Sequence, residues 1–171
     1  MRFWGGTRDS GMAAPITMTA SAEALFERAF ANHWEDVFRF VLALTNDWAS
    51  AEDITQESFS RLWQGRAKVD WERPILPWLF VVSRRLATDR FRILRRRIAG
   101  GSSSTGPDEA VRARWLDVQA AMGLLSPHER AALVLTAVEG MSYDEAAQTL
   151  DTTAGALRAA VSRARAKLEV A

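Results

Sequence analysis

The sequence predicts an all-α protein built from two small helical domains that are joined by a flexible Gly/Ser linker. Apolar residues recur at three- and four-residue steps, which is the spacing of amphipathic helices, and no segment has the alternation of a strand. Glycine, serine and proline dominate residues 100–107, which have little to bury and cost much entropy to order. A length of 171 residues fits one ordinary domain or two small ones, and 48% hydrophobic residues indicate a globular chain.

The composition excludes several kinds of protein and site. The chain has no cysteine, which excludes disulfides, thiolate-held metals and a cysteine nucleophile. Its two histidines, His33 and His128, are too few for a histidine-rich metal site. No apolar run approaches the roughly 18–20 residues of a membrane span, and the first part of the chain lacks the apolar segment of a secretory signal. We therefore expect a soluble, cytoplasmic protein without a metal or cofactor.

The charge is unevenly distributed, although the formal net charge is only +1. Residues 73–97 contain 8 arginines and one acidic residue, Asp89. Residues 156–171 contain 4 basic residues and one acidic residue, Glu169. Acidic residues outnumber basic ones in residues 21–72 and 98–155. A polyanion would therefore meet the two basic segments first.

The first domain is expected over residues 21–97, after a disordered leader at residues 1–20. Its expected helices are Ala22–Ala31, Trp34–Leu44, a helix from the N-cap Ser50 to about Gly65, and a long helix after a structured loop at residues 66–77. Asn46-Asp47 interrupts the helical pattern, and two prolines mark the loop. In the long helix one face is apolar, and most of the arginines occupy the other faces.

The second domain is expected over residues 111–171, after a linker at residues 98–110. Its expected helices are Val111–Met122, a helix from Pro127 to about Glu139, Tyr143–Leu150, and a helix from the N-cap Thr153 to about Leu168. The segments that start at Ser126 and Ser142 each have the Ser-x-x-Glu form of a capping box, which marks a helix start. The short turn at Asp151-Thr152 gives the last two helices helix-turn-helix form.

The last helix carries the candidate contacts to duplex DNA, because the second helix of such a unit enters the major groove. These candidates are Thr153, Arg158, Ser162, Arg163 and Arg165. Arg158 and Arg165 are seven residues apart and share one face. Arginine suits both phosphate and the O6/N7 edge of guanine. The alternative is a solvated basic helix that the helix dipole favours.

The arginine-rich helix is the second candidate for nucleic-acid binding. Residues 84–97 contain seven arginines and one acidic residue, which is dense for a solvated helix face. Four aromatic residues lie within or beside this stretch: Trp71, Trp78, Phe80 and Phe91. Aromatic rings and arginines together suit unstacked single-strand bases. Core packing is the alternative for each ring, and it is the favoured interpretation for Trp78 and Phe80.

The helix that follows Asn46-Asp47 has an acidic and polar side. Asp53, Gln56 and Glu57 are three and four residues apart and share this face. The residues expected to point inward are Ile54, Leu62 and either Phe59 or Trp63. A solvated face is the alternative for the acidic stretch taken alone. We find no catalytic dyad, phosphate-binding glycine loop, metal-ligand spacing or nucleophile–base arrangement, so an enzyme is the least supported class.

Taken together, these residues resemble the alternative sigma factors of the extracytoplasmic-function (ECF) group, which are promoter-selecting subunits of bacterial RNA polymerase. The matching segments of the first half are AEDITQESF (51–59), WLF (78–80) and ATDR (87–90). Those of the second half are LSPHER (125–130), EGMSYDEAA (139–147) and SRARAKL (162–168). The order and spacing of the segments match as well, over about residues 22–169.

The resemblance implies a sigma factor that binds core RNA polymerase and promoter DNA, with no cofactor and no enzymatic step. Asp53, Gln56 and Glu57 match the face that docks on the coiled coil of the largest polymerase subunit. The first domain would capture the melted minus-ten element through Lys68, Asp70, Trp71, Arg84, Arg85, Arg92 and Arg95. The helix-turn-helix domain would read the minus-thirty-five element as duplex. Because the chain ends at Ala171 without a further domain, control by a separate anti-sigma factor is expected.

The sequence departs from the family pattern at two places in the helix-turn-helix. A frequent Gly-Thr-Val-Lys-Ser-Arg pattern is Gly155–Ala160 here, with alanine at the last two positions, and the usual Leu-Gly of the turn is Leu150-Asp151. The alternative function is a polymerase-independent helix-turn-helix repressor or activator. It would leave the acidic helix face, the tryptophan-rich loop and the arginine-rich helix unexplained.

Overall fold

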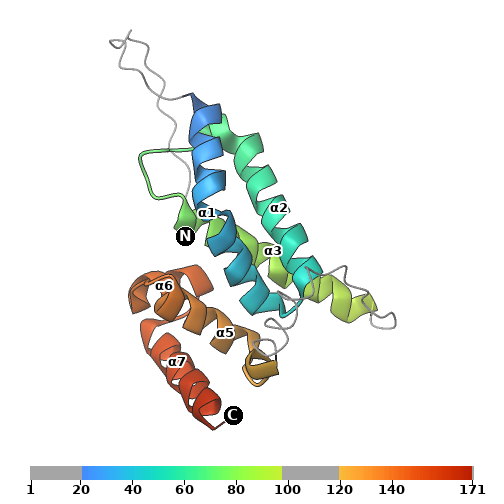
Figure 1. Cartoon of the computed structure of the whole chain (residues 1–171), viewed down its shortest axis with the longest axis vertical. Helices are drawn as coiled ribbons and strands as arrows, with labels where there is room; N and C mark the ends of the chain where they lie inside the picture. The colour runs from blue at the N-terminus through green and yellow to red at the C-terminus, as the bar shows by residue number, and fades with distance from the viewer. Residues whose placement is uncertain (1–20, 98–119, 171) are drawn as a thin grey trace.

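The computed structural model describes residues 21–97 and 120–170, without the side chains of residues 91–97. The elements of the first group are α1 (Ala22–Thr45), α2 (Trp48–Gly65), η1 (Arg66–Lys68) and α3 (Leu76–Arg97). Those of the second group are α5 (Pro127–Leu133), the π-helical segment η2 (Val134–Val138), α6 (Tyr143–Leu150) and α7 (Ala154–Glu169). The described residues contain no strand, and the predicted all-α class is confirmed (Figure 1). The predicted leader and linker lie outside these residues.

Helix α1 is one continuous helix where the sequence analysis expected two, so the expected break between Ala31 and Trp34 is wrong. No glycine or proline interrupts the segment. Phe30 and Trp34, one turn apart on α1, both pack against Phe59 of α2, with ring centroids 5.1 and 5.6 Å away. This tertiary packing continues the helix through a stretch whose intrinsic helix propensity is only moderate.

The turn between α1 and α2 is built by Asn46 and Asp47. Asn46 ends α1 in the left-handed conformation (φ 54°), which asparagine tolerates better than most residues. The side chain of Asp47 accepts a hydrogen bond from the backbone N–H of Ser50 at 2.8 Å. Asp47 is therefore the N-cap of α2, and the expectation that Ser50 is the cap is wrong. The predicted end at Gly65 is confirmed.

Both predicted capping boxes form. The N–H of Glu129 donates to the Ser126 hydroxyl at 3.3 Å, and the N–H of Ser126 donates to the Glu129 carboxylate at 2.8 Å. The corresponding distances for Ser142 and Glu145 are 3.3 and 2.9 Å. After α5 the chain continues as η2, which the spacing of apolar residues did not distinguish from an α-helix.

The two groups of helices pack against each other, α1 on α5 and α3 on α6, and their buried residues form one cluster. Arg130 of α5 is only 6% exposed and joins the groups. Its guanidinium donates to the carbonyls of Ala43 and Leu44 at the end of α1, and to those of Met122 (3.1 Å) and Leu125 (2.7 Å). The last carbonyls of a helix lack partners within it, and the last turn of α1 contains no basic residue. Arg130 therefore caps α1 from the second group.

Candidate nucleic-acid and polymerase interfaces

Helices α6 and α7 form the predicted helix-turn-helix. Asp151 ends α6 in the left-handed conformation (φ 56°), and its N–H donates to carbonyls in the last turns of that helix. Aspartate tolerates this conformation, so the turn closes without the usual glycine. The Thr153 hydroxyl accepts from the N–H of Ala156 at 3.2 Å and begins α7. Thr153 thus has a structural role, and its position at the start of α7 is the one predicted.

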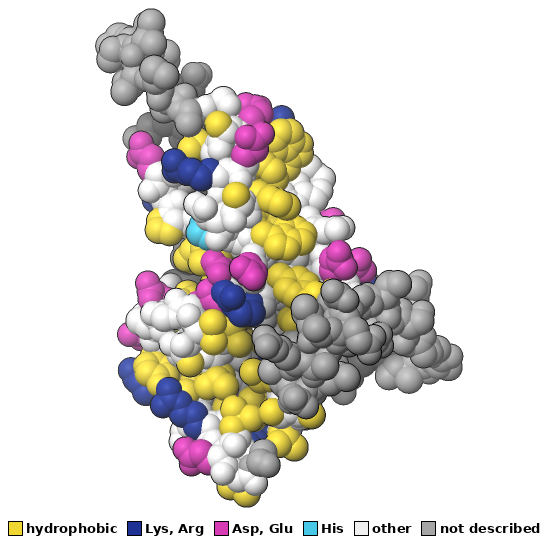
Figure 2. Space-filling model, in the orientation of Figure 1, with side chains coloured by type: hydrophobic (Ala, Val, Ile, Leu, Met, Phe, Trp, Pro, Cys, Tyr) yellow, Lys and Arg dark blue, Asp and Glu magenta, His cyan; other side chains and the backbone are white. Residues whose placement is uncertain are grey.

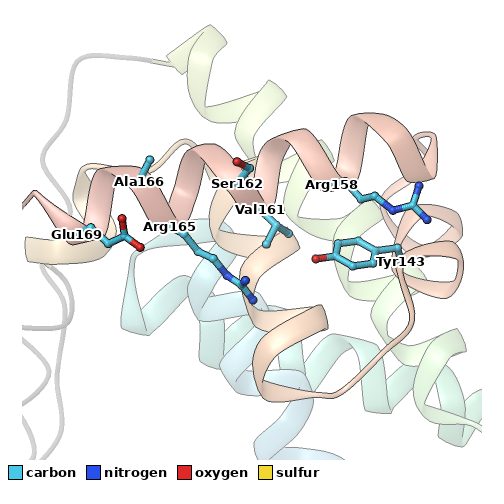
Figure 3. Close-up of a pocket in the computed structure, with 7 residues that line it drawn as sticks. All are labelled: Tyr143, Arg158, Val161, Ser162, Arg165, Ala166 and Glu169. Atoms are coloured by element: carbon cyan, nitrogen blue, oxygen red, sulfur yellow. The ribbon is translucent and has the colours of Figure 1, made fainter.

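Three of the residues predicted to contact duplex DNA lie together on α7. Arg158, Ser162 and Arg165 line a shallow groove with Tyr143, the first residue of α6 (Figure 3). The Arg158 guanidinium lies over the Tyr143 ring, 5.3 Å from its centroid, which is within cation–π distance. Sequence reasoning did not single out Tyr143, although the capping box had placed it at a helix start.

Arg163 lies on a different side of α7, about 140° around the helix axis from Arg158. Its Nε is 3.4 Å from Glu129, and the Nζ of Lys167 is 2.8 Å from the same carboxylate. The Glu129 side chain is 5% exposed, and hydrogen bonds from Lys167 and the backbone of Ser126 lower its pKa to about 2. These pairs tie α7 to the start of α5. Arg163 itself remains 59% exposed.

The arginines of α3 have different environments. Arg85 is exposed to solvent. Arg84 is only 22% exposed, and its Nη2 lies 3.8 Å from the carboxylate of Asp151 in the helix-turn-helix turn. Its Nε is buried and has no hydrogen-bond partner among the described residues. Arg92 and Arg95 lie on the last turns of α3, and their side chains are outside the described residues. Arg84 therefore contributes to the contact between the two groups of helices.

The loop between η1 and α3 is shaped by its own polar groups. The indole N–H of Trp71 donates to the carbonyl of Arg66 at 3.0 Å, and its ring packs half-buried against the core. The Asp70 carboxylate accepts from the N–H of Glu72 at 3.2 Å. Lys68, at the end of η1, is exposed. Of the predicted loop contacts, Asp70 and Trp71 hold the loop conformation, whereas Lys68 is presented to solvent.

Asp53, Gln56 and Glu57 are all exposed on one side of α2, as the spacing predicted. Asp53 lies 2.8 Å from Arg90 of α3, and Glu57 lies 2.9 Å from Arg61 one turn later. The two carboxylates remain 59% and 51% exposed. The ion pairs are therefore open to solvent and available to a partner.

Gln56 also borders an apolar groove between α1 and α2, where hydrophobic side chains reach the surface (Figure 2). The other residues that line it are Phe26, Phe30, Trp34, Phe59, Ser60 and Trp63. Phe59 points inward and is 2% exposed, whereas Trp63 is 39% exposed and stacks under the guanidinium of Arg66. The groove was not predicted from the sequence, although the four-residue spacing of the aromatic residues of α1 indicates an aromatic helix face.

Comparison with known proteins identifies the family. Residues 29–97 match the family model "Sigma-70 region 2", and residues 115–168 match "Sigma-70, region 4". The ECF RNA polymerase sigma factor SigL of Mycobacterium tuberculosis is 33% identical over 155 residues, which are 85% of this chain and 88% of SigL. The chain belongs to the ECF RNA polymerase sigma factor family. The resemblance inferred from the sequence is thereby confirmed.

Other ECF relatives and solved structures agree with this assignment. The sigma factor CarQ of Myxococcus xanthus is 31% identical over 157 residues, which are 86% of this chain and 88% of CarQ. The structure of the sigma factor CnrH with the cytosolic domain of CnrY is similar with a TM-score of 0.66 at 26% identity, and covers 88% of each chain. The sigma factor RpoE of Bartonella quintana, solved with the anti-sigma factor NepR, shares the fold with a TM-score of 0.68 at 22% identity, over 84% of this chain and 94% of RpoE.

As an ECF sigma factor, the chain acts in promoter-specific transcription initiation, and its partners are core RNA polymerase and promoter DNA. The family consists of DNA-binding regulatory proteins rather than enzymes. Within residues 21–97 and 120–170, none of the helices has the length and apolar character needed to cross a bilayer.

Proposed function

We propose that this sigma factor reads the minus-thirty-five element as duplex with α7 and the minus-ten element as a melted strand with the first group of helices. The observation that carries the proposal is the exposed face of α7, on which Arg158, Ser162 and Arg165 lie together in a well-formed helix-turn-helix. Arginine in the major groove binds guanine through O6 and N7, and a helix of this kind enters that groove with its N-terminal part.

The minus-ten element is assigned to residues 66–74 and α3. Extruding a base from the duplex costs a few kcal/mol, which a shaped pocket and stacking can offset. The loop has a defined shape before DNA binds, because Trp71 and Asp70 are hydrogen-bonded within it. Lys68 within this segment and Arg85 on α3 are exposed, and they suit contacts with the phosphates of the melted strand.

Docking on polymerase is assigned to Asp53, Gln56 and Glu57, whose proposed partner is the coiled coil of the largest subunit. Their exposure on one side of α2 supports this assignment. Charges of this kind act mainly on association rate and on partner choice. The proposed site of action is accordingly the bacterial cytoplasm, where the polymerase acts.

Reading both elements at once requires the two groups of helices to separate. The element names imply a distance of 25 base pairs, or about 85 Å at 3.4 Å per base pair. A compact chain of this length has a radius of gyration of about 16 Å, so its diameter is about half that span. The predicted linker at residues 98–110 can reach about 43 Å when extended. The contacts of α1 with α5 and of α3 with α6 would break in the polymerase complex.

Regulation by a separate anti-sigma factor is the last part of the proposal. Its support is the likeness to CnrH, whose structure was solved with the cytosolic domain of CnrY. The arrangement described here, with the two groups in contact, is a compact form that such a partner can hold away from polymerase.

The test is transcription by core polymerase reconstituted with the full chain, with the transcript starts identified by sequencing. Paired elements upstream of the starts are expected. A promoter with a pre-melted bubble then tests strand binding by the first group of helices separately from promoter melting. Exchanging residues 66–74 for another loop should change the preferred bubble sequence. Arg85→Ala should weaken binding to every bubble. Arg158→Ala should relax preference in the upstream element by about 1–3 kcal/mol at one position.

Two results would contradict the proposal. If the chain binds a duplex operator without polymerase and supports no initiation, it is a repressor or activator. If the loop exchange leaves the minus-ten preference unchanged, strand recognition lies elsewhere in the first group.

A further inference from the structure

We propose that Tyr143 is a positioning residue for promoter reading, which holds Arg158 in the direction of one base pair of the minus-thirty-five element. The proposal rests on the assignment of α7 to that element. It starts from the groove in Figure 3, where the Tyr143 ring from α6 lies beside the Arg158 side chain from α7. The guanidinium carbon is over the ring, 5.3 Å from its centroid.

Tyr143 is a firm support because its backbone and ring are both held. It is the first residue of α6, directly after the N-cap Ser142, and both reciprocal bonds of the capping box with Glu145 are present. A third bond joins the Ser142 hydroxyl to the Glu145 carboxylate at 2.7 Å. The ring is half-buried against the hydrophobic core. A tyrosine side chain has two rotatable angles, so little further freedom is lost when it binds Arg158.

Arg158 needs such a support because no carboxylate provides one. Arg163 and Lys167 on the same helix pair with Glu129. Among the described residues, no acidic side chain lies within ion-pair distance of Arg158, which is exposed. A carboxylate partner would repel DNA and compete for the N–H groups. An aromatic ring instead binds the face of the guanidinium and leaves its N–H edge free to donate to a base.

The neighbours of Arg158 make its direction more important. Ala159 and Ala160 follow it on α7, and neither has a polar side-chain group that can contact a base. Ser162 and Arg165 lie one and two turns further along the same face. Base reading by the first turns of α7 therefore falls largely on one long side chain, and the Tyr143 ring restricts where that side chain points.

The experiment uses the full chain bound to core polymerase and a promoter library with all four bases at each position of the minus-thirty-five element. Arg158→Ala should abolish the preference at one position. Tyr143→Leu and Tyr143→Met should each reduce the preference at that same position by about two- to five-fold, the range of an exposed cation–π contact. Tyr143→Phe keeps the ring and should retain the preference. Thermal unfolding identifies which of the two aliphatic variants keeps the wild-type fold.

Double variants separate positioning from other effects. Tyr143→Leu should add nothing in the Arg158→Ala background, but should add its full effect in the Arg163→Ala background. The proposal is overturned if both aliphatic variants keep the wild-type preference, or if Tyr143→Leu weakens all sequences alike in every background. A wild-type complex without any upstream preference would instead contradict the assignment of α7, on which the proposal rests.

Discussion

Replacing Arg130 by methionine tests how far one buried side chain stabilises this fold. The guanidinium donates to four carbonyls, two at the end of α1 and two near the start of α5. Hydrogen bonds to a charged group contribute about 1.5–3 kcal/mol each, and a buried carbonyl left without a partner costs about 1–3 kcal/mol. Methionine retains the packing of the arginine stem, and water reaches some of the freed carbonyls. We therefore expect Arg130→Met to lose about 3 kcal/mol of unfolding free energy, or about 6–12 °C in Tm.

Urea unfolding of the full chain, followed by far-ultraviolet circular dichroism, measures this loss. Arg61→Met is the matched control, because Arg61 is 48% exposed and makes one ion pair with Glu57 on its own helix. The control should change the unfolding free energy by less than about 0.5 kcal/mol. If Arg130→Met costs no more than the control, the carbonyls do not depend on Arg130, and its capping of α1 from the second group contributes nothing to stability.

Two further predictions concern Glu129 and the polymerase face. The folded protein holds the pKa of Glu129 at about 2, below its ordinary value of 4.5, so the stability that ionised Glu129 contributes is present above pH 4.5 and is lost as the pH falls toward 2. In urea unfolding between pH 7 and 3, Glu129→Gln should therefore lose less unfolding free energy than wild type. An equal loss in both proteins would refute the coupling. The double variant Asp53→Lys/Glu57→Lys reverses two charges and should weaken binding to core polymerase in a titration, while its unfolding free energy should change by less than about 1 kcal/mol. The control Glu27→Lys/Glu35→Lys, on the exposed side of α1, should leave binding unchanged.

Local signals in the sequence predicted most helix ends, because the residues that set those ends act on their own neighbours. The Ser-x-x-Glu segments at Ser126 and Ser142 form capping boxes whose bonds span three residues. The break at Asn46-Asp47 is equally local. The continuity of α1 was not predictable in this way, since it depends on Phe59, a residue of the next helix. Local pattern also gave no indication of the π-helical segment η2.

The candidate site also contains features that the sequence predicts locally and contacts that depend on the packing of helices. Helical periodicity placed Arg158 and Arg165 on one face of the last helix, and placed Asp53 with Gln56 and Glu57 on one face of α2. The ring beneath Arg158 and the carboxylate beside Arg163 come from α6 and α5, so only the packing of helices reveals them.

Ion pairs form part of the interface that the proposed function requires to open. The Arg84–Asp151 pair spans 3.8 Å and is partly exposed, so it contributes at most about 1 kcal/mol. In the Arg39–Glu139 pair, which spans 3.2 Å, the Glu139 side chain is only 6% exposed, and the cost of burying its charge offsets the attraction. Burial and the nearby charge of Asp36 raise the pKa of Glu139. Ionisation of Glu139 as the pH rises therefore weakens the contact between the two groups, and separation of the groups returns the carboxylate to water.

Arg130 keeps two of its four bonds when the groups separate, because Met122 and Leu125 belong to its own group. The carbonyls of Ala43 and Leu44 are then left at a helix end, where water can bind them. Opening therefore removes hydrogen bonds that water can replace, but it also exposes apolar residues that the two groups bury in one cluster. For the proposed separated form to predominate, the binding energy on polymerase and promoter has to exceed the cost of exposing this apolar surface.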